Sequence, residues 1–139
     1  MRKLVVLLLL WTLALAAEVP VSSLALVPGL LWPAPTWRVL GEACERAVAE
    51  LAPTLPEGKE LAEAQCYRWV ADPKDAATYL YFLARGLSEA GFRLFSETMP
   101  REGTLVQVWE NGERRLYLGL RFGEEGVFVV AGWLEPIGG

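Results

Sequence analysis

The sequence has no histidine, which removes the side chain most often used as a general base at neutral pH and as a metal ligand. It has no glycine-rich phosphate-binding motif, and its glycines lie at expected turns and strand bends. None of the four serines belongs to a Ser-x-x-Lys motif, so neither His nor this motif is available to activate a serine nucleophile. No catalytic residue, metal site or cofactor is therefore predicted.

The sequence also has fewer basic than acidic residues. The 139 residues include 13 Lys and Arg against 17 Asp and Glu, for a net charge of −4. Nucleic-acid binding requires a basic surface, so this balance argues against DNA or RNA as a partner. Asn and Gln are rare and Arg is more frequent than Lys, a bias typical of heat-adapted proteins and also of GC-rich genomes.

There are only two cysteines, Cys44 and Cys66, and they are too far apart for a Cys-x-x-Cys redox motif or zinc knuckle. In an exported chain they would form one disulfide. The enclosed loop predicts a stabilisation of about 3 kcal/mol by the chain-entropy model. Two buried free thiols are the alternative.

The N-terminus carries the pattern of a secretory signal. Met1-Arg2-Lys3 is basic, the next 12 residues are apolar, and Ala14-Leu15-Ala16 matches a small-residue cleavage site. We expect cleavage after Ala16, which leaves an exported periplasmic or extracellular chain of net charge −6 with no stable membrane span. An uncleaved signal anchor that tethers the protein to the membrane is the alternative.

Residues 17–37 are rich in proline but too apolar for a solvated linker. They predict an extended N-terminal arm that precedes a single α+β domain at 38–139. The arm would either lie on this domain or serve as a docking peptide for another protein.

Two segments have helical spacing of apolar residues, 38–52 and 72–90. The second begins with Asp72-Pro73 as cap and first helical residue and ends before Gly91. The segment 57–71 is ambiguous, with a strand at 65–71 favoured by its aromatic and valine residues.

Beyond Gly91 the apolar pattern alternates, which predicts strands at 92–98, 104–110, 113–122 and 127–134. Asn111-Gly112 predicts a two-residue hairpin turn, and residues 123–126 predict a four-residue turn. The expected fold class is α+β, with one long helix packed on a four- to five-stranded antiparallel meander, preceded by a second helix and the proline-rich arm.

These turns set registers in which Val108 pairs with Arg115 and Leu120 with Val129. One sheet face should then cover the long helix; it carries Leu105, Trp109, Leu116, Leu118, Leu120, Phe122, Val129, Ala131 and Trp133. The opposite face mixes apolar and charged residues; it carries Val106, Val108, Glu110, Arg115, Tyr117, Arg121, Phe128, Val130 and Leu134.

This second face is the candidate site. Either the arm and helix 38–52 cover it, or part of it stays open to a partner or ligand, with Arg115, Tyr117, Arg121 and Phe128 as contacts. The expected partner is a protein or a small apolar or anionic ligand.

The sequence thus favours a small exported, non-catalytic binding or accessory domain of the cell envelope. A structural subunit that docks through its arm is one alternative, and a small carboxylate-based hydrolase is another. The carboxylates near strand ends are Glu97, Glu102, Glu110 and Glu113.

Overall fold

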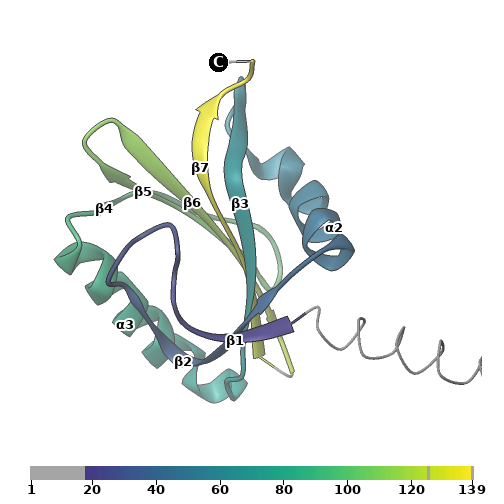
Figure 1. The fold of residues 1–139 in the computed structure, drawn as a ribbon, viewed down its shortest axis with the longest axis vertical. Coiled ribbons are helices and arrows are strands. Elements are labelled where there is room, and N and C mark those ends of the chain that lie inside the picture. The colour runs from purple at the N-terminus through teal and green to yellow at the C-terminus, as the bar shows by residue number, and fades with distance from the viewer. Residues whose placement is uncertain (1–17, 125, 139) are drawn as a thin grey trace, which may run out of the picture.

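The structure is a computed structural model that describes residues 18–124 and 126–138 (Figure 1). The expected signal at 1–16 lies outside these residues. Within them, no helix is both long enough and apolar enough to cross a bilayer.

A single seven-stranded antiparallel sheet dominates the described chain, with the strand order β1-β2-β3-β7-β6-β5-β4. Two α-helices and two short 3-10 turns complete it. The elements in chain order are β1 (Glu18–Ser23), β2 (Leu31–Val39), α2 (Glu42–Leu51), η1 (Ala52–Thr54), β3 (Lys59–Trp69), η2 (Pro73–Asp75), α3 (Ala76–Glu89), β4 (Arg93–Arg101), β5 (Thr104–Asn111), β6 (Arg114–Gly123) and β7 (Gly126–Pro136).

The predicted fold class was therefore wrong in its main feature, because seven strands form the sheet where four or five were expected. The C-terminal meander was correct, since β4 to β7 pair in chain order. The ambiguous segment 57–71 forms the long strand β3, which pairs with β7 at the centre of the sheet.

The proline-rich arm is the second correction, because it forms strands β1 and β2 of the sheet. Pro20 lies opposite Trp37 in the outermost strand β1, and edge strands are where proline is tolerated in a sheet. Pro33 and Pro35 lie where β2 bulges between its two registers with β1. An edge strand and a bulge both tolerate proline, so the prolines of the arm did not exclude strands.

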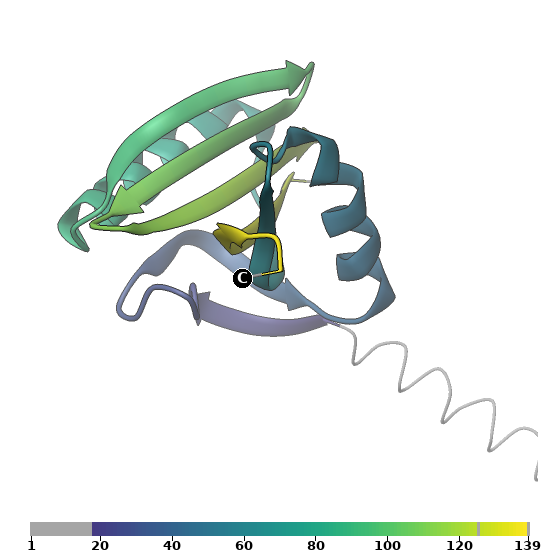
Figure 2. The ribbon, with the colours of Figure 1, turned by 90° about the horizontal axis from the view of Figure 1, so that it is seen from above.

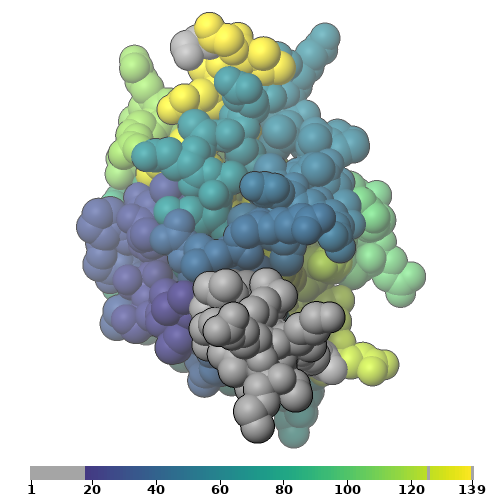
Figure 3. Space-filling model, turned by 45° about the vertical axis from the view of Figure 1, so that its right-hand side comes forward, coloured from purple at the N-terminus to yellow at the C-terminus, as the bar shows by residue number. Residues whose placement is uncertain are grey.

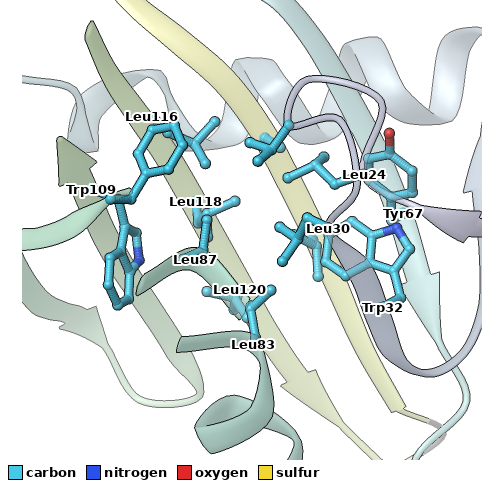
Figure 4. Close-up of a cluster of buried hydrophobic side chains, with 14 of the residues drawn as sticks. Leu24, Leu30, Trp32, Tyr67, Leu83, Leu87, Trp109, Leu116, Leu118 and Leu120 are labelled. Atoms are coloured by element: carbon cyan, nitrogen blue, oxygen red, sulfur yellow. The ribbon is translucent and has the colours of Figure 1, made fainter. Parts of the chain in front are cut away.

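The two faces of the sheet are covered by different helices, as Figure 2 shows. Helix α3 packs Leu83 and Leu87 against the face that was expected to receive it, and this larger core also includes Trp109, Leu118 and Leu120 (Figure 4). The loop between β1 and β2 adds Leu24 and Leu30 to the same core. The arm region thus covers the first face and not the second.

The register of the β6–β7 hairpin was predicted correctly, whereas that of β5–β6 was wrong by two residues. Asn111 pairs with Arg114, so the turn consists of Gly112 and Glu113. Gly112 has a φ of 62°, which suits a turn with glycine at its first central position. A shift of two residues leaves every side chain on its predicted face, but it changes the neighbours across the strands.

Candidate functional site

The structure separates the four residues predicted for the second face. Tyr117 is completely buried beneath η1, where it packs with Val106 and Val108. Arg115 lies near the β5–β6 turn and faces the Phe95 ring. Arg121 and Phe128 are paired across β6 and β7. Only this last pair lines a common hollow in the surface.

Helix α2 forms one wall of that hollow. Its apolar side chains pack on the second face beside Val130, and the disulfide between Cys44 and Cys66 attaches it to β3, as the sequence predicted. Figure 3 shows this side of the molecule, with α2 in blue beside the yellow-green surface of the sheet. The covalent attachment holds α2 against the sheet next to Arg121.

Gly119 allows the helix to approach this closely. A Cβ atom added at Gly119 would lie 2.7 Å from Cδ1 of Leu51 and 3.2 Å from the ring of Tyr117. Such a Cβ would force the Leu51 side chain to move from its present position. The missing side chain therefore brings Leu51 onto the strand and shapes the space beside it.

Two hollows with shared lining residues make up what we call the Arg121 site. The inner pocket has a volume of about 30 Å³ and lies between α2 and the sheet; it is lined by Ala47, Glu50, Leu51, Arg101, Thr104, Gly119, Arg121, Phe128 and Val130. The outer groove, about 520 Å³, follows the end of the β6–β7 hairpin; it is lined by Arg68, Arg121, Phe122, Gly123, Glu124, Gly126, Val127 and Phe128. Arg121 and Phe128 belong to both.

Positive charge exceeds negative charge at the inner pocket. Arg121 Nη1 lies 3.1 Å from Oε2 of Glu50, and its guanidinium is 5.4 Å from the centre of the Phe128 ring. Arg101 lies beside it and makes no ion pair with any residue of the described chain. Two guanidinium groups therefore face one carboxylate.

Thr104 adds to the same pocket a hydroxyl that has no protein partner in the described chain. Its exposed fraction is only 4%, and within residues 18–124 and 126–138 its side chain makes no hydrogen bond. In the described chain, the fully buried side-chain atoms without a partner are Trp32 Nε1 and Trp69 Nε1, so the Thr104 hydroxyl is still reached by solvent. By contrast, the hydroxyl of Thr36, a residue of similar burial, donates to the carbonyl oxygen of Ala34.

Sequence reasoning missed Arg101, Thr104 and Glu50. The correct β5–β6 register places Thr104 opposite Arg121, whereas the predicted register placed it opposite Gly119. Because the predicted β5–β6 register was wrong by two residues, it did not place Thr104 beside Arg121. Glu50 was interpreted only as the solvent-facing side of a helix, and its spacing alone carried no sign that it would meet Arg121.

None of the four carboxylates considered for hydrolysis lines the inner pocket, and two of them have other partners. Glu97 accepts a hydrogen bond from Gln107, and Glu110 pairs with Arg93 and Arg115. In the described part of the chain, no group of three or more Cys, Asp and Glu side chains could hold a metal ion. The arrangement around Arg121 can bind an anionic group.

An ion pair links β1 to the outer groove and makes stability depend on pH. Arg68 donates two hydrogen bonds to Glu18, from Nε at 3.1 Å and Nη2 at 2.9 Å. These bonds lower the pKa of Glu18 below its ordinary value of 4.5. The folded state therefore favours the ionised form, so the contribution is present above pH 4.5 and is lost as the pH falls below it.

Glu18→Gln should consequently lower the melting temperature by about 1–3 °C at pH 7, since both side chains are partly exposed. The difference from the unmodified protein should disappear near pH 3. Thermal unfolding followed by circular dichroism at both pH values measures it. The matched control is Glu42→Gln, which breaks a far more exposed pair with Arg46; an equal effect of both changes would contradict the assignment.

Comparisons of this chain with protein-family models, with curated proteins and with solved structures found no match. Its function is therefore inferred from the geometry and charge of the Arg121 site.

Proposed function

We propose that this chain is an exported, non-catalytic binding domain that receives a ligand group in the Arg121 site. The observation that supports it most directly is that Arg121 and Phe128 line both the inner pocket and the outer groove. Binding sites commonly combine an apolar wall with a few polar groups that orient the ligand. Here Leu51, Val130 and Phe128 supply the wall, and Arg101 with Arg121 supplies the polar groups.

Export is supported by the disulfide between Cys44 and Cys66, because such bonds form and persist in oxidising compartments. The basic and apolar pattern at 1–16 supports the same compartment.

The two alternatives have less support. A structural subunit that docks through a free arm would need residues 17–37, but from Glu18 onward this segment supplies two strands of the sheet and core side chains such as Leu24 and Trp32. A carboxylate-based hydrolase would need a pair of carboxylates across a cleft, and Glu97 and Glu110 are already bonded to Gln107 and Arg93.

Nuclear magnetic resonance can test whether the Arg121 site binds a ligand. The probe is a tetrapeptide of three alanines and a terminal leucine, prepared once with a free C-terminal carboxylate and once with an amide. We expect at least one form to shift the amide signals of Gly119, Arg121 and Phe128 saturably, with a Kd of about 1 mM. Binding to a small open site by a short peptide should be of this order because few contacts are made.

Arg121→Gln should weaken this binding about tenfold or more, because it removes a charged donor that faces the site. Arg85→Gln is the matched control, since Arg85 also pairs with a glutamate on an exposed helix surface but lies on α3. Signal changes that are absent for both probes, or that persist unaltered in Arg121→Gln, would contradict the proposed function.

A further inference from the structure

We infer that the Arg121 site recognises a single carboxylate group, held in the inner pocket by the guanidinium groups of Arg101 and Arg121 and by the hydroxyl of Thr104. This inference rests on the proposed function and adds the chemistry of the ligand to it.

The hydroxyl of Thr104 indicates that the inner pocket takes a hydrogen-bond acceptor. This side chain is more than nine-tenths buried, yet it has no hydrogen-bond partner in the described chain and it lines the pocket. Because its hydroxyl oxygen is not among the fully buried atoms without a partner, the hydroxyl is reached from the pocket and can donate to an acceptor placed there. An oxygen of a bound carboxylate would supply that acceptor.

The balance of charge indicates that the acceptor is anionic. Arg101 and Arg121 outnumber Glu50 at the pocket, although the chain as a whole is acidic. Guanidinium groups bind carboxylates through paired, charge-assisted hydrogen bonds. Glu50 already accepts one such hydrogen bond from Nη1 of Arg121, so an external carboxylate must compete with it.

The size of the pocket selects the carboxylate over larger anions. A volume of about 30 Å³ corresponds to about two water molecules, which matches the two oxygens of a carboxylate. The rest of the ligand would lie along Phe128 in the outer groove. Glu124 lines the far part of this groove, where its charge disfavours a second anionic group.

The two forms of the tetrapeptide test this inference directly. The carboxylate form should bind at least tenfold more tightly than the amide form, and this ratio should fall as salt is raised. Sodium acetate, as a free small carboxylate, should shift the signals of Thr104 and Arg121 with weaker affinity than the peptide, because it leaves the outer groove empty. Equal affinity for acetate and the peptide carboxylate would identify a small free carboxylate as the ligand.

Variants of three residues then separate recognition from folding. Thr104→Val removes the hydroxyl with little change of shape, so it should weaken carboxylate binding about threefold to tenfold while the melting temperature stays unchanged. Thr36→Val is the matched control: it breaks a real hydrogen bond, so it should lower the melting temperature and leave the affinity unchanged. Glu50→Gln should bind the carboxylate about threefold more tightly, because the internal competitor is neutral.

The outcomes distinguish this inference from the proposed function. If the amide form binds as well as the carboxylate form, the anion inference is wrong while the binding function stands. If neither form binds, both are wrong. A loss of stability without loss of affinity in Thr104→Val would show that the hydroxyl has a protein or water partner and would overturn its role in recognition.

Discussion

Replacement of Tyr117 by alanine should lower the free energy of unfolding by about 3–5 kcal/mol, because it removes a fully buried aromatic side chain. The ring fills the space between the second sheet face and the chain that follows α2. It packs with the side chains of Val106, Val108, Leu51, Leu55, Leu61 and Leu134. No neighbouring element is free to collapse into the vacated volume, because η1 is held between α2 and β3.

Tyr117→Phe removes the hydroxyl and keeps the ring, so it measures the contribution of the hydroxyl alone to stability. The Tyr117 hydroxyl lies 2.6 Å from the hydroxyl of Thr54, which in turn donates to the carbonyl oxygen of Leu51. Loss of this one bond should cost about 1 kcal/mol. Burial raises the pKa of Tyr117 above its ordinary value of 10, so the neutral side chain contributes its full stability below pH 10 and loses it as the pH rises further.

Urea unfolding followed by tryptophan fluorescence measures both changes. Arg121→Gln is the control from the same strand and should leave the midpoint nearly unchanged, since its side chain is largely exposed. A loss below about 1 kcal/mol for Tyr117→Ala would show that this face is open and that α2 and η1 do not cover it.

The position of Tyr117 shows what the sequence of this protein predicts correctly, namely which residues share a face of the sheet. Alternation along residues 104–134 placed Tyr117, Arg121 and Phe128 on one face and Leu116, Leu118 and Leu120 on the other, and the structure agrees. Local patterns define faces because side chains alternate strictly along a strand. They do not say what covers a face, which depends on contacts between distant segments.

The features that the sequence did not predict depend on contacts between distant segments. The β1–β2 hairpin was missed because its prolines argue against strands unless the strand is known to be at an edge or bulged. Thr104 was missed because the turn at Gly112 was placed one residue early, which moved every cross-strand partner by two positions. Glu50 meets Arg121 across 71 positions in the sequence, and no local pattern predicts such a pair.

The disulfide should matter for both stability and binding, because α2 has few other attachments. The helix has only ten residues, no side-chain cap at Gly41 and no basic residue in its last turn. A helix this short is not stable without packing. Its contacts with the sheet are a small cluster around Ala47 and Val130 and the packing of Leu51 beside Tyr117. Cys44 adds a covalent link to β3 that the cluster alone does not replace.

We therefore expect the variant with both Cys44→Ala and Cys66→Ala to be about 3 kcal/mol less stable, from the larger conformational freedom of its unfolded chain. Amide hydrogen exchange in α2 should accelerate far more than exchange in α3, since only α2 loses an attachment. Because α2 supplies Ala47, Glu50 and Leu51 to the inner pocket, affinity for the tetrapeptide should fall as well.

Treatment with a reducing agent should reproduce these effects in the unmodified protein and change nothing in the variant. Equal unfolding midpoints with and without the disulfide would instead mean that packing alone holds α2 in place, and the wall of the Arg121 site would then be independent of the redox state.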